Sequence, residues 1–284
     1  DFAKAVSADF GHRSREQTLM TDIMPSVSAM KHARKHFESW ARGEKRKATF
    51  PLGLLGAKAE IVYQPKGVVG VIAPWNFPIA IPAWKAAPAL AAGNAVILKP
   101  ADQTPGCAHL LAQILAEAGC PAGVFNLVMG RGSEIGSALV THPGVAAISF
   151  TGSERVGRGI AVDCARGMKK VQLEMGGKNP MIVTAQADMD LAVAACLNGA
   201  FFSTGQRCTA SSRLIVEARI HDAFVEKLVT AMAALRIGDP LQPDTQIGPV
   251  VSEAQLAGNL EYVRIAAEEG CEVLGGQRLD MPGT

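Results

Sequence analysis

The cysteines of this sequence lack the spacings that build a metal site or a disulfide framework. The six of them lie at positions 107, 120, 164, 196, 208 and 271, with no CxxC pair and no cysteine and histidine spacing suited to tetrahedral zinc. We therefore expect neither a structural metal nor a small fold stapled by disulfides.

The sequence also lacks an excess of one charge and a long apolar run. Lys and Arg total 28 against 26 Asp and Glu, so no overall field marks nucleic acid or a membrane as a partner. Glu38 and Glu44 lie among the basic residues of 31–47, which we interpret as a solvated helix face. The apolar run 67–73 is too short to cross a bilayer, and no signal-peptide pattern is present, so we expect a cytoplasmic protein.

The pattern of apolar residues predicts helix in the first part of the chain and then short strands. Residues 14–47 have helical spacing, which Pro25 breaks or kinks. Runs rich in β-forming residues at 60–63 and 68–73 flank Pro65 and Gly67, and they predict two strands joined by a turn.

Helices and strands then alternate along the chain. The predicted helices are 79–92, 105–118, 133–140 and 154–166, and the predicted strands are 95–98, 124–128, 146–150 and 170–174. This alternation predicts an α/β fold, with a Rossmann-like parallel sheet covered by helices on both faces. Such sheets bind ligands at the carboxyl ends of their strands, so we expect the cofactor near the loops after 73, 98 and 150.

A domain boundary is predicted near residue 176, where two glycines follow a strand. The domains are then 1–176, which would bind the cofactor, and 177–284, a second α/β domain. A strand at 181–183 and helices near 188–202, 219–235 and 252–268 form the second domain, which looks incomplete at its C-terminal side.

Two residues suit a covalent mechanism. Cys208 follows a helix and Gly205 and has Gln206 and Arg207 beside it, an environment that can activate a thiol, although a lone cysteine is also often a small buried apolar residue. Glu174 ends a strand before two glycines, so it is either a general base toward water or an ordinary surface carboxylate.

Three loops suit an oxyanion and a nucleotide. Asn76, in the rigid turn 74–78, offers an amide donor for an oxyanion, unless that turn is purely structural. Lys99 and Asp102 end a strand where ribose hydroxyls would lie. Gly152 and Ser153 open a helix whose N–H groups suit a pyrophosphate, although the motif is not GxGxxG.

Taken in this order, these segments resemble the aldehyde dehydrogenase superfamily from about residue 60 to the end. The resemblance matches Asn76 to the Asn of Pro-Trp-Asn-Phe-Pro, Glu174 to the Glu of Glu-Leu-Gly-Gly-Lys, and Cys208 to the Cys of Gly-Gln-x-Cys. It implies that Cys208 attacks an aldehyde, that Asn76 and the Cys208 N–H hold the oxyanion, and that Glu174 activates water to hydrolyse the thioester.

The resemblance also implies a nicotinamide cofactor. Its contacts would be Lys99 and Asp102 on the ribose, Gly152 and Ser153 on the pyrophosphate, and Trp75, Val156 and Met175 beside them. A carboxylate at Asp102 would repel a 2′-phosphate, which favours NAD, with NADP as the alternative.

The substrate is a small-molecule aldehyde whose identity stays open. Residues 7–40 and 63–70 resemble coniferyl aldehyde dehydrogenases, whereas 174–213 resembles semialdehyde dehydrogenases. Arg207 either favours an acidic aldehyde or is a buried structural guanidinium.

Residues 48–65 resemble the family's oligomerisation hairpin, which implies a homodimer or homotetramer of the complete protein. The family's downstream Glu-x-Phe-Gly-Pro motif is not present in this sequence. One alternative is therefore a truncated, non-catalytic nucleotide-binding or structural relative. Another is an acylating dehydrogenase that uses coenzyme A, against which the retained Glu174 argues.

Overall fold

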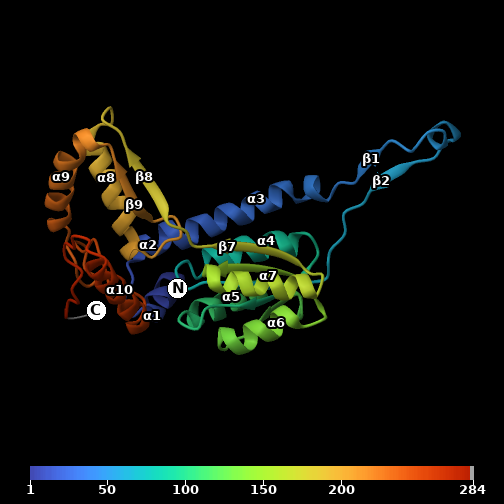
Figure 1. The fold of residues 1–284 in the computed structure, drawn as a ribbon. Helices are drawn as coiled ribbons and strands as arrows, with labels where there is room; N and C mark the ends of the chain where they lie inside the picture. The colour runs from blue at the N-terminus through green and yellow to red at the C-terminus, as the bar shows by residue number, and fades with distance from the viewer. Residues whose placement is uncertain (282–284) are drawn as a thin grey trace. The chain divides into compact units, whose positions relative to one another are not determined.

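The computed structural model describes residues 1–281 and divides the chain into two compact units (Figure 1). One unit is Leu19–Met175, and the other joins Asp1–Thr18 to Gly176–Thr284. The predicted domain 1–176 differs from this division at residues 1–18 and by the single residue Gly176. Hydrogen bonds explain the difference at residues 1–18, because His12 Nδ1 lies 2.8 Å from Asp239 Oδ1 and Gln17 Nε2 donates to Ser203 Oγ at 2.8 Å. Positions 282–284 of the predicted second domain lie outside the described residues.

The helix predicted over 14–47 is in fact several elements. Arg15–Thr18 is a short helix, α2, and Leu19–Ile23 is a π-helical turn, η1. α3 then runs over Met24–Ala41, with Pro25 in its first turn, where the missing N–H is no loss. α3 begins at Met24, directly after the π-helical turn and with Pro25 as its second residue, and it ends at Ala41, before the predicted limit of 47.

Buried Asp22 fixes the start of the next helix in its unit. Its Oδ1 accepts hydrogen bonds from the N–H groups of Ile79 and Ala80, both at 3.1 Å. These groups open α4, Ala80–Ala91, and a carboxylate is favourable at a helix N-terminus. α3 also packs along α4, so residues 19–41 hold α4 both at its N-terminus and along its length.

The predicted α/β class is confirmed by a five-stranded parallel sheet in the first unit. Its order is β5-β4-β3-β6-β7. The strands are β3 Val68–Ile72, β4 Ala95–Lys99, β5 Phe125–Leu127, β6 Val145–Gly152 and β7 Lys170–Met175. The chain builds outward from β3 to β5 and then returns to place β6 on the other side of β3. This reversal is a topological switch point, beside which ligands bind in open parallel sheets.

The connecting helices cover this sheet and close its core. They are α4, α5 Pro105–Glu117, α6 Ser137–Thr141 with the π-helical turn η3 Gly132–Gly136 before it, and α7 Glu154–Arg166. α4 packs on β3 and β4, while α6 and α7 pack on β6 (Figure 1). Ile72, Leu139, Ile148 and Phe150 are among the buried residues of the core cluster they enclose.

A separate antiparallel ribbon joins β1, Glu44–Arg46, to β2, Ala59–Ile61. The strands predicted near 60–63 and 68–73 are both present, as β2 and β3, but β2 pairs with β1 and not with β3. The linker between them is held elsewhere, since the N–H groups of Lys66 and Gly67 both donate to Asn94 Oδ1. In Figure 1 the ribbon extends away from the sheet of its own unit.

The other unit is built on a two-stranded parallel sheet. β8, Asn179–Val183, pairs with β9, Ser211–Val216, a strand that the sequence pattern did not predict. Its helices are α1 Phe2–Asp9, α2, α8 Met189–Phe201, α9 His221–Ala233 and α10 Glu253–Glu268, with short 3-10 turns at η4 Phe202–Gly205 and η5 Ala218–Ile220. Its core cluster includes Val183, Cys196 and Phe224. Among the described residues, no helix has the length and apolar character to cross a membrane.

Candidate active site

The predicted oxyanion turn follows β3 directly, at the carboxyl edge of the sheet. Pro78 is buried, and Trp75 and Asn76 are half-buried. Asn76 Oδ1 accepts a hydrogen bond from the N–H of Phe77 at 3.1 Å. The carbonyl end of this amide is thereby fixed on the backbone, so the NH2 group is the end that can donate to other groups.

Lys99 and Asp102 form an ion pair at the end of β4. The Lys99 side chain is only 4% exposed, and its Nζ lies 2.9 Å from Asp102 Oδ1, whereas the Asp102 side chain is 47% exposed. The lysine stem runs beside η3, because a Cβ at Gly136 would lie 3.9 Å from Lys99 Cδ. A buried cation therefore orients a carboxylate that reaches solvent.

The loop after β6 leads into the N-terminus of α7. Gly152 is opposite Met175 of β7, and a Cβ at Gly152 would lie 2.5 Å from Phe150 Cζ, so the backbone passes very close to that ring. Ser153 is the N-cap residue, and its side chain makes no capping hydrogen bond. Val156 and Met175, which are 43% and 37% exposed, flank this first turn. The free N–H groups of such a turn suit an anion.

Glu174 lies on β7 opposite Thr151, and its side chain is exposed. Lys85 of α4 interacts with it electrostatically: burial lowers the pKa of Lys85 to about 8, and the Glu174 carboxylate acts in the opposite direction. Lys85 Nζ donates to Ser149 Oγ at 2.8 Å. Sequence reasoning missed Lys85, although a single charge in the apolar stretch 79–92 was a usable signal.

Cys208 lies in the second unit, after a turn of unusual backbone conformation. Ser203, Thr204 and Gly205 have φ angles of +53°, +58° and +67°. Cys208 is exposed, and its carbonyl accepts from Asn179 Nδ2 at 2.6 Å. Burial raises the pKa of the Cys164 and Cys196 thiols, which keeps both less reactive. The remaining predicted site residues all lie in the unit Leu19–Met175, along the carboxyl edge of its sheet.

The Arg207 guanidinium points into its own unit. It donates to the carbonyls of Asn198 and Gly199 at the end of α8, and it stacks over the Phe202 ring at 5.0 Å from the centroid. Burial lowers the pKa of Arg207. Of the two interpretations open from the sequence, these contacts favour a structural guanidinium at a helix C-terminus.

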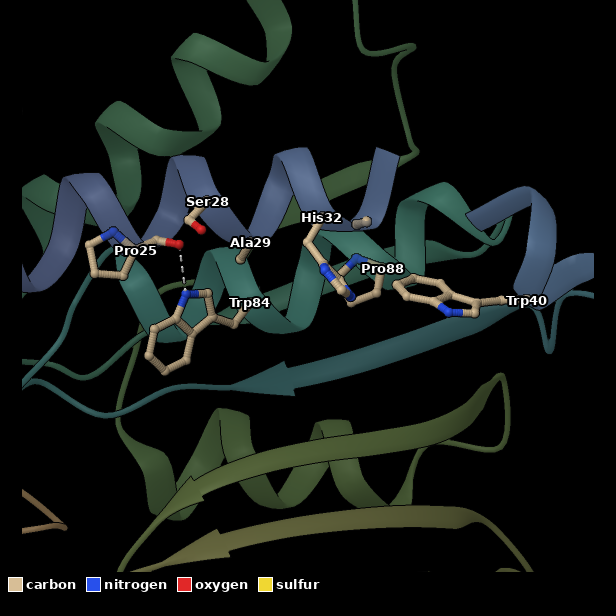
Figure 2. A pocket seen from close by; sticks show the side chains of 8 residues that line it. Pro25, Ser28, Ala29, His32, Trp40, Trp84 and Pro88 are labelled. Carbon is tan, nitrogen blue, oxygen red and sulfur yellow. Dashed lines mark hydrogen bonds between the residues drawn. The ribbon is translucent and has the colours of Figure 1, made fainter. Parts of the chain in front are cut away.

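A groove of about 450 Å³ lies between α3 and α4, away from these loops. Figure 2 shows His32, Trp40 and Trp84 along it, and the Trp84 indole N–H donates to the Pro25 carbonyl at 3.2 Å. None of the site residues predicted from the sequence lines this groove.

Comparison with known families covers the whole chain: the model of the aldehyde dehydrogenase family matches residues 1–284. This chain belongs to the aldehyde dehydrogenase family. The resemblance inferred from the five motif segments is thereby confirmed.

Curated relatives within the aldehyde dehydrogenase family differ in the aldehydes that they are named for. The alpha-ketoglutaric semialdehyde dehydrogenase of Bacillus subtilis (strain 168) is 50% identical over 218 residues, which cover 76% of this chain and 44% of the relative. A betaine aldehyde dehydrogenase of Cereibacter sphaeroides (strain ATCC 17029 / ATH 2.4.9) is 46% identical over 239 residues, covering 83% and 48%. The chain thus spans about half the length of the curated relatives that it matches.

Crystal structures of aldehyde dehydrogenases agree with the fold. The NAD+ complex of the Bacillus cereus enzyme superposes with a TM-score of 0.91 at 33% identity, over 98% of this chain and 55% of that one. The gamma-glutamyl-gamma-aminobutyraldehyde dehydrogenase of Burkholderia cenocepacia J2315 gives 0.90 at 38% identity, again over 98% and 55%.

Proposed function

We propose that this chain is the part of an NAD(P)+-dependent aldehyde dehydrogenase that carries its nucleophile, and that the protein oxidises an aldehyde to a carboxylic acid. The observation that carries the proposal is the family match over residues 1–284. The resemblance of the segments around Asn76, Glu174 and Cys208 to the family's motifs supports the same proposal.

In the proposed reaction the Cys208 thiolate attacks the aldehyde carbon. The amide NH2 of Asn76 and the N–H of Cys208 donate to the oxyanion that forms, which stabilises the tetrahedral species. A bound nicotinamide would supply the acceptor for the hydride that leaves this carbon. Glu174 then takes a proton from water, which attacks the thioester and releases the acid.

The residues of the first unit fit a nicotinamide dinucleotide. The half-exposed Asp102 carboxylate, oriented by Lys99, can accept from ribose hydroxyls, and the first turn of α7 at Ser153 can bind the pyrophosphate. Trp75, Gly152, Val156 and Met175 would line the same binding site. The Asp102 charge favours NAD over NADP.

We further propose that the protein is a cytoplasmic homodimer or homotetramer. All six cysteines are free in the structure, as expected in a reducing compartment. The exposed apolar side chains of the ribbon, Phe50, Leu54 and Leu55, are each 79% exposed and suit an interface with a second copy.

The test of the proposed activity is reduced-nicotinamide absorbance, with NAD+ or NADP+ and a panel of aromatic, aliphatic and acidic aldehydes. We expect turnover that is lost in Cys208→Ala, because the covalent intermediate cannot form. Loss of turnover in Glu174→Gln, with one burst of reduced nicotinamide retained, would separate hydrolysis from hydride transfer. Folded protein that binds nucleotide yet turns over no aldehyde would contradict the proposal.

A further inference from the structure

The turn before Cys208 is held in a conformation that its sequence disfavours. Ser203 and Thr204 both adopt left-handed backbone angles, and Gly205 follows with a third positive φ. Glycine adopts this region without penalty, but Ser and Thr carry a Cβ that makes it costly. Such a turn persists only where its surroundings stabilise it.

Two separate segments of the same unit, one at Gln17 and one at 248–251, supply that stabilisation. Gln17 Nε2 donates to Ser203 Oγ at 2.8 Å, and Thr204 Oγ1 donates to the Gly248 carbonyl at 3.1 Å. Gln206 Oε1 accepts from the N–H of Val251 at 2.9 Å. Hydrogen bonds thus hold the two strained residues themselves and Gln206 after them, and the contact from Gln17 comes from 186 residues away in the chain.

The same contacts fix the position of the backbone that leads into Cys208. The hydrogen bond from Asn179 to the Cys208 carbonyl holds the far end of the segment, so the turn and the cysteine backbone are both anchored. A displacement of about 1 Å at a nucleophile can lower a reaction rate by orders of magnitude. Contacts that select one conformation of this turn therefore affect the reactivity of the thiol.

We propose that Gln17, in the N-terminal segment, is a positioning residue for Cys208, which it holds in place through Ser203 and the left-handed turn. The proposal rests on the proposed role of Cys208 as the nucleophile. It assigns to residues 1–18 a part in presenting the thiol, although these residues lie far from it in sequence.

The test measures alkylation of Cys208 by limiting iodoacetamide, followed by peptide mass spectrometry across pH 6 to 9 in the purified protein. Exposed Cys271 is the internal reference. Loss of one neutral hydrogen bond predicts that Gln17→Ala lowers the rate at Cys208 about five-fold, and leaves Cys271 unchanged. The matched control is Lys4→Ala, an exposed residue of the same segment, for which both rates should stay unchanged.

Two substitutions at Ser203 separate positioning from general loss of structure. Ser203→Ala removes the hydroxyl but keeps the strain, so it should slow Cys208 as much as Gln17→Ala does. Ser203→Gly removes the hydroxyl and the strain together, so it should restore most of the rate. Adding Gln17→Ala to Ser203→Ala should lower the rate by less than the two single effects combined, since both substitutions remove the same hydrogen bond.

Turnover gives a second readout, in which kcat should fall in Gln17→Ala with little change in KM for the cofactor. Equal alkylation rates at Cys208 in the native protein, Gln17→Ala and Ser203→Ala would overturn the proposal. A lower alkylation rate at Cys208 in Ser203→Gly than in Ser203→Ala would also overturn it. Failure of the proposed function looks different: Cys208 of the native protein would then be alkylated no faster than Cys271.

Discussion

At the scale of single residues, Lys85 shows how burial changes the pKa of a charged group. Its pKa is lowered to about 8 by burial, below the 10.5 of an unburied lysine, with Glu174 opposing the shift. The folded protein therefore binds fewer protons than the unfolded chain between these two values. The contribution of Lys85 to the free energy of unfolding must therefore rise as the pH increases from about 8 to 10.5.

The corresponding prediction compares the native protein with Lys85→Met in urea unfolding at pH 7.5 and pH 10. The free energy of unfolding of the native protein should increase relative to that of the variant as the pH rises, because the cost of burying the charge disappears. A difference that is constant, or that moves the other way, would contradict the lowered pKa.

Residue-level prediction from the sequence succeeded where a motif carries the information. Lys99 and Glu174 lie at the ends of β4 and β7, and Asn76 and Asp102 lie in the loops that follow β3 and β4, as their motifs predicted. The orientation of Arg207 could not be predicted, since it depends on carbonyls that helix α8 directs toward it. Gln17 was missed for a similar reason, because its partner is distant in the chain.

At the scale of elements, Gly70 of β3 allows the sheet to pack closely on α6. A Cβ at this position would lie 2.7 Å from Ile148 Cδ1 and 3.1 Å from Leu139 Cγ. We expect Gly70→Ala to lower the free energy of unfolding by about 1 to 3 kcal/mol, since these buried side chains must shift.

Gly159→Ala, on the exposed face of α7, is the matched control for this substitution. A Cβ there meets no atom within 4 Å, so alanine should stabilise the helix by about 0.5 to 1 kcal/mol. Urea unfolding of both variants checks the pair. Equal effects of the two substitutions on the free energy of unfolding would show that packing against α6 does not restrict the size of the residue at position 70.

Element-level prediction worked best where helices and strands alternate in a parallel sheet. The strands of 68–175 follow from their apolar runs, whereas β9 was missed because its polar residues Ser211, Ser212 and Arg213 hide the pattern. The pairing of β2 with β1 could not be predicted, because short strands carry little information about pairing. The path of the linker between β2 and β3 is fixed by Asn94, which lies outside both strands and accepts hydrogen bonds from Lys66 and Gly67.

At the scale of the whole molecule, the ribbon supports the proposed assembly. A two-stranded ribbon presents unpaired edges, and its tip carries large apolar side chains in solvent. We expect the double substitution Leu54→Asp and Leu55→Asp to lower the mass measured by light scattering to that of a monomer, because both side chains would leave the interface.

Leu191→Asp provides the control, since Leu191 is also exposed, at 69%, but lies on α8. The assembly formed by the Leu191→Asp variant should have the same mass by light scattering as that of the native protein. A monomeric native protein, or an unchanged mass after the double substitution, would show that the ribbon is not the interface.

The division of the chain into units has a consequence for its synthesis. Residues 1–18 leave the ribosome before their partners, because the partners of Gln17 and His12 follow 186 and 227 residues later. At common translation rates this is a delay of roughly 10 to 40 seconds, during which the β3–β7 sheet can form while residues 1–18 lack these contacts. Nascent chains of this protein therefore expose residues 1–18 to chaperones and proteases until the second unit is made.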